Sequence, residues 1–366
     1  MRSELRVDPI TGATVLISPA RARRPLVLRT ELPGEQEAVE KPDSLASDPF
    51  LEGHEDETEP ETLAVRKPGS IPNGPGWLVR CISNRYPAVY GTENSTPEET
   101  ESACGNENPL HDAAIQPLPG VGLHEVVVEC PQYETHLSRL PALQIGHVVR
   151  LWRDRLASFQ KQEAGWSYGF VFKNQGRLAG ASLPHSHSQI MVLPFVPQPF
   201  AAEIAKCRDE LLATGRSLWA DLIAREQQAG LRIVVETPHF LGMAPYASRF
   251  PFELRILPKR AQAHFSSLAD EMCDELGRHL KDLLQALEAM AGDPDYNLVL
   301  QTAPLRDTDD GSFCWRLELL PRMGGIAGFE WGTGAFINTI PPEEAAMMYR
   351  SQLQRLVSQQ ASADRP

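Results

Sequence analysis

Two segments of this 366-residue chain repeat each other at a nearly constant spacing, and this repeat constrains the fold more than any other sequence feature. The first segment runs from residue 125 to residue 194, and the second runs from 253 to 321. The matched landmarks lie 127 or 128 residues apart: Pro131 and Pro258, His136 and His264, Tyr168 and Tyr296, Pro194 and Pro321. A nearly constant offset over four landmarks indicates a duplicated unit.

Each copy has the pattern of a strand, a helix, a strand, a glycine-containing loop and a third strand. Apolar residues at helical spacing predict helices over about 141–163 and 266–290, and another over about 201–229 joins the copies. The clearest apolar stripe, which we interpret as core packing, comprises Leu276, Leu280, Leu283, Leu284 and Leu287. These elements predict an α+β fold with two antiparallel sheets and flanking helices, related by a pseudo-twofold.

The segments outside the repeat have less regular patterns. Residues 77–83 (WLVRCIS) read as a strand that ends at Asn84, Arg85 and the proline that follows them. Residues 31–75 and 93–119 are rich in Glu, Asp, Pro and Gly, so we expect surface excursions with little regular structure and no core strands.

Charge and apolar content exclude some classes of function. The chain has 35 Lys+Arg against 48 Asp+Glu, a net charge of -13, which argues against general affinity for nucleic acid or an anionic membrane. No stretch approaches the roughly 20 apolar residues of a membrane span, and no signal-like apolar region opens the chain, so we expect a cytoplasmic protein. The six cysteines have no paired spacing, which favours reduced thiols over a disulfide framework or a zinc cluster.

The stretch from Phe172 to Gln189, FKNQGRLAGASLPHSHSQ, carries the strongest functional signal. If its end is a strand, then His185, His187 and Gln189 point to one face, because strand side chains alternate with a period of two. Three polar groups on one face do not fill a core, so this pattern favours a function.

An imidazole attacks phosphorus well when one ring nitrogen is free and the other is hydrogen-bonded. Gln189 would then hold the nonbridging oxygens of the intermediate, and Gly176, Gly180 and Ser182 would let backbone N–H groups approach a phosphate. By itself, a histidine pair at alternate strand positions is more often a metal-ligand pair, but here further ligands are missing.

With these residues, the chain resembles the galactose-1-phosphate uridylyltransferase family, a branch of the histidine-triad superfamily, over nearly its whole length. The resemblance implies that His187 in PHSHSQ is the nucleophile, with Gln189 and His185 as its catalytic neighbours. It also implies that Arg21 and Arg24 hold the sugar phosphate. The other implied substrate-binding residues are Asn84, Arg85, Asn174, Gly176 and Ser182.

Two departures concern the metal sites that some members of the family contain. Asp48 and Leu51 stand where the family's zinc site has two cysteines, and Tyr133 replaces a histidine, so only His185 remains of the four ligands. Arg316 and Glu318 stand near the positions where some members of the family have the paired histidines of a second metal site, so that site is also expected to be lost. We therefore predict no metal and no cofactor, although a different cluster using Asp48 or His54 stays conceivable.

The third departure concerns the acceptor. The tail Ile326–Gly334 looks more like the nucleotide-sugar phosphorylases than the hexose enzymes, so phosphate could replace a hexose 1-phosphate as second substrate. We predict that a nucleotidyl group is transferred from a nucleotide sugar by a ping-pong mechanism. The activity we favour is uridylyl transfer from UDP-glucose to a hexose 1-phosphate, and the alternative is a phosphorylase that acts on ADP-glucose or a dinucleoside polyphosphate. A nucleotide sensor without turnover is the alternative from another class.

The resemblance also implies the organisation of the molecule. We expect two tandem histidine-triad-like halves, a catalytic half over residues 1–195 and a second half over 196–366. We expect a homodimer, because the family builds its active site across subunits.

Overall fold

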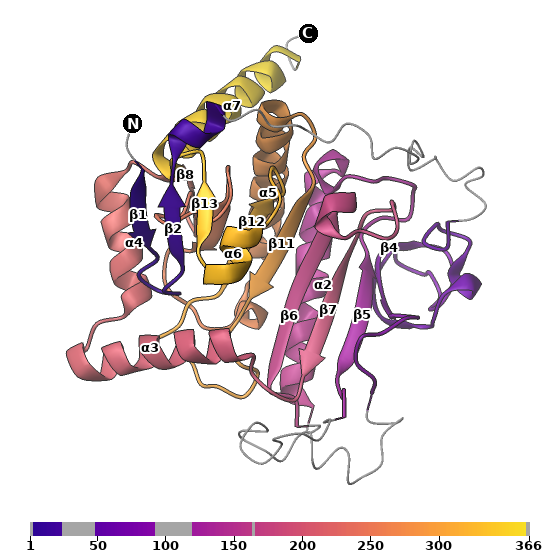
Figure 1. Cartoon of the computed structure of the whole chain (residues 1–366). Helices are drawn as coiled ribbons and strands as arrows, with labels where there is room; N and C mark the ends of the chain where they lie inside the picture. Colours follow the sequence, from indigo (N-terminus) through magenta and orange to yellow (C-terminus); the bar gives the residue numbers. More distant parts are fainter. Residues whose placement is uncertain (1–2, 24–47, 92–118, 163–164, 364–366) are drawn as a thin grey trace.

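The computed structural model describes residues 3–23, 48–91, 119–162 and 165–363. Ten strands form one antiparallel sheet in the order β3-β4-β5-β7-β6-β11-β12-β10-β9-β8 (Figure 1). The strands are β3 (Glu61–Arg66), β4 (Trp77–Ser83), β5 (Leu123–Val128), β6 (Tyr168–Gln175), β7 (His187–Leu193), β8 (Ile233–Glu236), β9 (Phe240–Met243), β10 (Leu254–Pro258), β11 (Tyr296–Gln301) and β12 (Arg316–Pro321). The strand order mirrors itself about the β6–β11 pair, as a pseudo-twofold between the two copies requires.

Two long helices cover one face of this sheet, where they lie side by side (Figure 1). They are α2 (Ala142–Lys161) and α5 (Asp270–Ala291), one from each copy. They cross at two glycines: a Cβ on Gly277 would come within 2.6 Å of the backbone nitrogen of Gly146. The main core lies between these helices and the sheet, and it includes the Leu stripe of α5.

The opposite face of the sheet is partly covered. In the second half, α3 (Gln198–Thr214) and α4 (Leu218–Ala229) pack on it through an apolar cluster that contains Cys207, Trp219 and Met243. Over β5 and β7 of the first half, Figure 1 shows no α-helix of the described residues, and α3 contacts the start of β6 through Phe200, which packs on Tyr168. We call this side of the whole sheet the open face.

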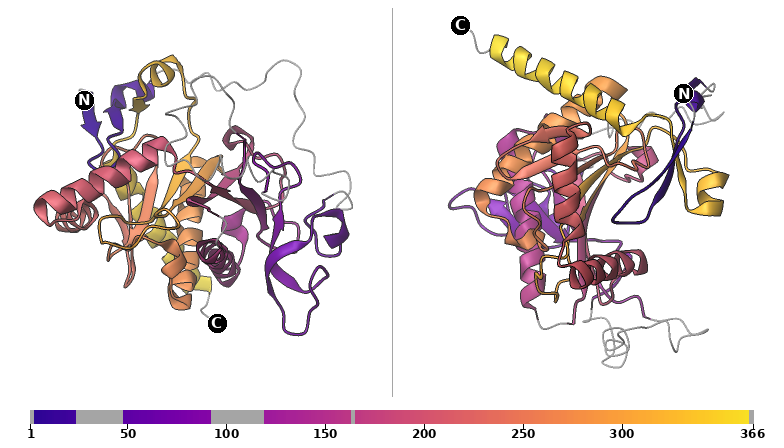
Figure 2. Two further views of the ribbon diagram at one scale, coloured as in Figure 1. Left: turned by 90° about the horizontal axis from the view of Figure 1, so that it is seen from below. Right: turned by 90° about the vertical axis from the view of Figure 1, so that its left-hand side faces the viewer.

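A small second sheet stands beside the open face of the second half (Figure 1). It has the order β1-β2-β13, from β1 (Glu4–Val7), β2 (Thr14–Ile17) and β13 (Phe336–Asn338). The remaining helices are α6 (Gly328–Thr333) and α7 (Pro342–Ala363), and α7 projects beyond the sheet in Figure 2. None of the helices in the described part is long and apolar enough to span a bilayer.

The α+β fold with repeated antiparallel units and flanking helices is confirmed, although the two expected sheets join into one. Two expectations are wrong in detail, and a third is not tested. The segment 31–75 contains β3, an edge strand paired with β4. The helix expected over 201–229 is two helices, because Gly215 ends α3 in a left-handed conformation and the Ser217 side chain caps α4. The segment 93–119 lies almost wholly outside the described residues, as does Cys104.

The matched tyrosines of the repeat also differ from expectation. Tyr168 packs on Phe170 and Phe200 at the open face, whereas Tyr296 is buried in the core beneath the helices. Asn297, not Tyr296, shares a face with the even-numbered residues of β6, because Asn297 pairs with Asn174. A twofold axis perpendicular to the sheet keeps each side chain on its own face. It must therefore match even-numbered residues of β6 with odd-numbered residues of β11, so the sequence offset of 128 is not the structural equivalence within these strands.

The division of the chain at residues 195 and 196 stays a prediction.

Candidate active site

His187 is the first residue of β7, and its side chain lies on the open face of the sheet. Its neighbour Ser188 points the other way, where its hydroxyl accepts a 2.9 Å hydrogen bond from the indole N–H of Trp152 in α2. Because side chains alternate along a strand, His187 and Gln189 share the opposite face. His185 precedes the strand, so the predicted alternation of three polar residues holds only for these two.

The hydrogen bonding of the His187 ring fixes which nitrogen is free to react. Nδ1 lies 2.7 Å from the backbone carbonyl oxygen of His185, which can only accept, so Nδ1 carries the proton and Nε2 the lone pair. Burial lowers the pKa of His187 below its ordinary value, and the nearby Lys173 ammonium lowers it further. The ring is thus neutral at pH 7, as nucleophilic attack requires.

A buried ion pair supports this strand from the helix side. The Lys173 ammonium donates to the Glu129 carboxylate at 2.8 Å, to the Ser186 hydroxyl at 3.0 Å and to the backbone carbonyl of His187 at 3.0 Å. Both charged side chains are almost completely buried. Because buried charges without partners are costly, this arrangement holds the backbone at His187 in one conformation.

Gln189 contacts a histidine that the sequence patterns do not single out. Its Oε1 lies 2.7 Å from Nε2 of His124 on the adjacent strand β5. The other ring nitrogen of His124 accepts a 3.1 Å hydrogen bond from the backbone N–H of Ala88. Asn84 lies 3.2 Å from the same Nε2, so the structure brings this predicted residue to Gln189 through His124.

The predicted glycine loop follows β6 and contacts the second half of the chain. Gly176 and Gly180 have φ angles of 80° and 90°, the left-handed region that favours glycine. A Cβ on Gly176 would come within 1.9 Å of the Asp295 carboxylate, so only glycine fits there. Asn174, just before the loop, receives a 2.9 Å hydrogen bond from Asn297 on β11.

His185 lies in the position that the family resemblance associates with zinc. Its Nδ1 lies 2.7 Å from the Asp48 carboxylate, and its Nε2 lies 2.9 Å from the carbonyl oxygen of Cys130. The Asp48 carboxylate is partly buried, which opposes ionisation, but the hydrogen bond and charge of His185 outweigh this and lower the Asp48 pKa. Tyr133 contacts the His185 ring edge-on. Within the described ranges, no three His, Cys, Asp or Glu side chains are grouped as a metal site would need.

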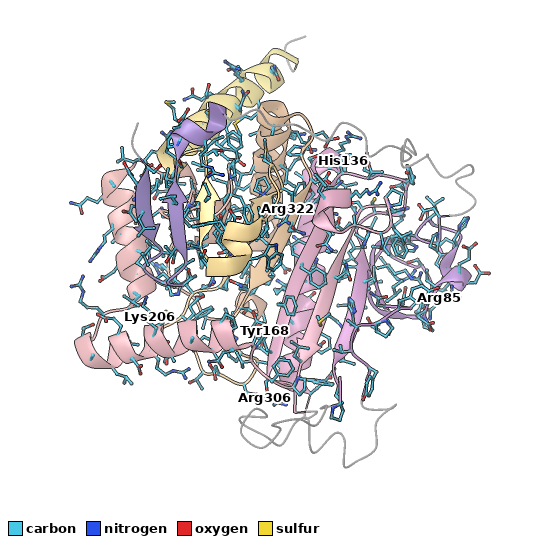
Figure 3. The ribbon with its side chains drawn as sticks, in the orientation of Figure 1. Arg85, His136, Tyr168, Lys206, Arg306 and Arg322 are labelled. Atoms are coloured by element: carbon cyan, nitrogen blue, oxygen red, sulfur yellow. The ribbon has the colours of Figure 1, made fainter. Side chains whose placement is uncertain are left out.

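No hydrogen bond or ion pair joins the remaining predicted site residues to His187 within the described part of the chain. Arg21 is exposed and lines a hollow of about 460 Å³ with residues of the second half, including Arg249 and Glu330. Ser182 and Arg85 are exposed, and Figure 3 shows Arg85 at the edge of the molecule, well apart from Tyr168 at the start of β6. Arg24 lies outside the described residues.

The sequence patterns missed four residues that contact the predicted site or the glycine loop: His124, Lys173, Asp295 and Asn297. A weak signal was present for two of them, because a lysine in the middle of an apolar strand and a histidine at the start of another are unusual in a core. Asp295 and Asn297 gave no signal, since their importance depends on β11 pairing with β6 across the repeat.

Comparison with known proteins agrees with these motifs. A family model described as galactose-1-phosphate uridyl transferase, N-terminal domain, matches residues 79–197, and one described as a domain of unknown function (DUF4921) matches 144–365. ADP-glucose phosphorylase of Arabidopsis thaliana is 35% identical over 349 residues, 95% of this chain and 92% of that protein. Galactose-1-phosphate uridylyltransferase of Thermotoga maritima is 32% identical over 237 residues, 63% of this chain and 74% of that protein.

The fold has the same relatives. The crystal structure of the Arabidopsis thaliana ADP-glucose phosphorylase with bound ADP-glucose superposes with a TM-score of 0.76 at 34% identity, covering 95% of this chain and 99% of that one. The chain therefore belongs to the galactose-1-phosphate uridylyltransferase family of the histidine-triad superfamily, a family of nucleotidyltransferases that includes nucleotide-sugar phosphorylases.

Proposed function

We propose that this protein transfers a nucleoside monophosphate through a covalent intermediate on His187. The observation that carries the proposal is the 2.7 Å hydrogen bond from Nδ1–H to the His185 carbonyl, because it leaves the lone pair on Nε2. Gln189 shares the strand face of His187 and supplies a neutral amide for the phosphoryl oxygens.

The reaction has two displacements at one phosphorus. Nε2 attacks the α-phosphorus of a nucleotide sugar, the bond to the bridging oxygen breaks, and a sugar 1-phosphate leaves. An oxygen of the acceptor phosphate then attacks the same phosphorus, the P–N bond breaks, and neutral His187 returns.

We favour ADP-glucose as donor and inorganic phosphate as acceptor, which gives glucose 1-phosphate and then ADP. The support is the likeness to ADP-glucose phosphorylase over 95% of this chain, together with the phosphorylase-like tail Ile326–Gly334. Uridylyl transfer from UDP-glucose to a hexose 1-phosphate, which the motifs alone favour, is the second candidate. Its support is the 32% identity to a galactose-1-phosphate uridylyltransferase over a shorter span.

Intact mass spectrometry after mixing the protein with ADP-glucose or UDP-glucose separately tests the proposal, because the mass of the adduct identifies the nucleotide. Acid-free conditions are needed, since a phosphoramidate is acid-labile. We expect an AMP adduct that phosphate discharges as ADP. A UMP adduct discharged only by a hexose 1-phosphate would favour the second candidate, and nucleotide binding without any adduct would favour the sensor.

We also propose that the active site is completed in a homodimer. The support is that Arg21 lies with residues of the second half rather than with β6 and β7 of its own chain. Co-expression of a His187→Ala chain with an Arg21→Ala chain tests this, because a mixed dimer would contain one intact site if the residues come from different subunits. Activity in the mixture, absent from both single variants, is the expected result. Equal inactivity of the mixture would place both residues in one chain's site.

A further inference from the structure

The amide groups of Gln189 and Asn174 each have one definite orientation, which a neighbouring side chain imposes. The backbone N–H of Ala88 donates to Nδ1 of His124 at 3.1 Å, so this nitrogen holds a lone pair and the proton of the neutral ring is on Nε2. Burial lowers the His124 pKa, which keeps the ring neutral. Nε2–H then donates to Oε1 of Gln189 at 2.7 Å, and the NH₂ group of Gln189 is left for another partner.

Asn84 does not compete for this proton. Its Oδ1 accepts a 2.9 Å hydrogen bond from the backbone N–H of Tyr86, so its NH₂ group is the side that lies 3.2 Å from His124. An Nε2–H cannot accept from an NH₂ group, so Gln189 is the partner that His124 holds.

Asn297 imposes the same orientation on Asn174. Its amide nitrogen lies 2.9 Å from the backbone carbonyl of Ala179, which can only accept, so this atom is identified as the donor without ambiguity. The same nitrogen lies 2.9 Å from the Asn174 side chain, which must therefore turn its oxygen toward Asn297. The NH₂ group of Asn174 points instead to the Gly180 side of the loop.

Three backbone N–H groups of the glycine loop are already hydrogen-bonded within the chain. The N–H groups of Gly180 and Ala181 bond to carbonyls inside the loop at 3.0 Å, and the N–H of Leu178 bonds to the Asp295 carboxylate. The expectation that several backbone N–H groups of this loop cradle a phosphate is therefore weakened. Side-chain amides are the other donors beside this loop.

Both amides lie beside the nucleophile on adjacent strands. Phe172 of β6 pairs with Gln189 of β7. Two residues further along β6 is Asn174, and two residues back along β7 is His187, so all four side chains share the open face. The NH₂ groups of two amides on this face suit the nonbridging oxygens of a phosphoryl group, whereas two carbonyl oxygens there would repel them.

We propose that His124 and Asn297 are positioning residues that lock the Gln189 and Asn174 amides with their NH₂ groups toward the transferred phosphoryl group. The proposal rests on the proposed function, and it assigns a task in the reaction to the second half of the chain, from which Asn297 comes.

A double-mutant cycle tests it, with single-turnover formation of the His187 adduct as the readout. Asn297→Ala should slow adduct formation by about tenfold or more in the wild-type background, the effect of a misdirected hydrogen bond to a charged group. In an Asn174→Ala background the same substitution should cost less than about twofold, because there is no amide left to orient. His124→Phe should behave in the same way toward Gln189→Ala.

A matched control comes from another amide and imidazole pair in the same chain. Gln160 of α2 lies 3.0 Å from Nδ1 of His264, away from β7 on the helix side of the sheet, so Gln160→Ala should leave the adduct rate unchanged. Equal losses in both backgrounds would mean that His124 and Asn297 act only on the general structure, which overturns the inference. If the wild-type protein forms no adduct with any nucleotide sugar, the proposed function itself fails, so the two failures are distinguishable.

Discussion

The open face of the sheet has opposite chemistry in its two halves, although one continuous row of paired residues crosses both. The row passes through Val126, Gln189, Phe172, Val299, Glu318 and Arg255, on β5, β7, β6, β11, β12 and β10. Gln189 and Glu318 therefore lie on the strands directly next to the central β6–β11 pair, one on each side. His187 lies two residues before Gln189, and Arg316 lies two residues before Glu318. The same strand positions carry a neutral nucleophile and amide on one side and opposite charges on the other.

In the second half these charges form ion pairs with one another and are buried. Arg316 donates to both oxygens of Glu203 in α3, at 2.7 and 2.8 Å, and to Glu318 at 3.1 Å. The Trp219 ring of α4 lies 5.1 Å from the Arg316 guanidinium and 5.6 Å from that of Arg255. All the polar side chains of this set are nearly inaccessible to solvent.

The difference teaches that one scaffold supports catalysis or stability depending on whether its polar groups still have bonding capacity. His187 has a free Nε2 lone pair, and the two oriented amides have free NH₂ groups. The guanidinium group of Arg316, in contrast, is hydrogen-bonded to the carboxylates of Glu203 and Glu318. Substitutions in the first half should therefore change the reaction, and those in the second half should change the stability.

The largest expected effect is the loss of the nucleophile. His187→Ala should abolish adduct formation and both half-reactions, because no other lone pair lies at that position, while the midpoint of thermal unfolding changes little. His185→Ala should keep some adduct, since it is the backbone carbonyl of His185 that holds Nδ1 of His187. Mass spectrometry of both variants under acid-free conditions is the measurement, and an adduct on the His187 variant but not on the His185 variant would reverse the assignment.

Removing the corresponding charge in the second half should act on folding instead. Arg316→Met leaves Glu203 and Glu318 buried with one partner fewer, so we expect a loss of about 3–5 kcal/mol in the free energy of unfolding. Urea unfolding measures it. The exposed pair of Arg216 and Asp221 is the matched control, and Arg216→Ala should cost less than about 1 kcal/mol. A loss for Arg316→Met no larger than this control would show that the buried network does not stabilise the fold.

A smaller effect is expected in the pH dependence of adduct formation. Burial and the Lys173 charge lower the His187 pKa, so the neutral ring persists below its ordinary value of 6.5 and the rate should fall only at more acidic pH. Lys173→Met removes a charge that lowers this pKa and leaves Glu129, which raises it, so the acidic limb should move to higher pH. Replacing both, as Lys173→Met with Glu129→Gln, should move the limb less. If the acidic limb of the single variant does not move, the Lys173 charge does not lower the His187 pKa.

The smallest expected effect is that of metal removal. Both ring nitrogens of His185 already have partners, in Asp48 and the Cys130 carbonyl, so the fold has a substitute for a zinc ion at this position. Protein prepared with a chelator should unfold at the same temperature and react at the same rate as untreated protein. Stoichiometric zinc in the purified protein, with a lower melting temperature after chelation, would contradict this prediction.

The repeat and the motif predicted much of the fold. The duplicated strands, the two long helices and a strand that contains His187 and Gln189 all follow from local periodicity. The edge strand β3 was not predicted because only three of its six residues are apolar and it lies in a segment rich in Glu, Pro and Gly, so its pairing with β4 is what defines it. The break between α3 and α4 was marked by Gly215 and Ser217, and the apolar spacing on either side concealed it.

The sequence by itself determined the family, the α+β fold and the alternation that puts His187 and Gln189 on one face, because these depend on neighbours in the chain. Only the tertiary structure decided that His185 lies outside the strand and bonds to Asp48, and that His124 and Asn297 orient the two amides. These contacts join residues 65 to 137 positions apart. The contacts of His124 with Gln189 and of Asn297 with Asn174 depend on the register between strands, and a shift of one residue in that register would turn these side chains to the other face of the sheet.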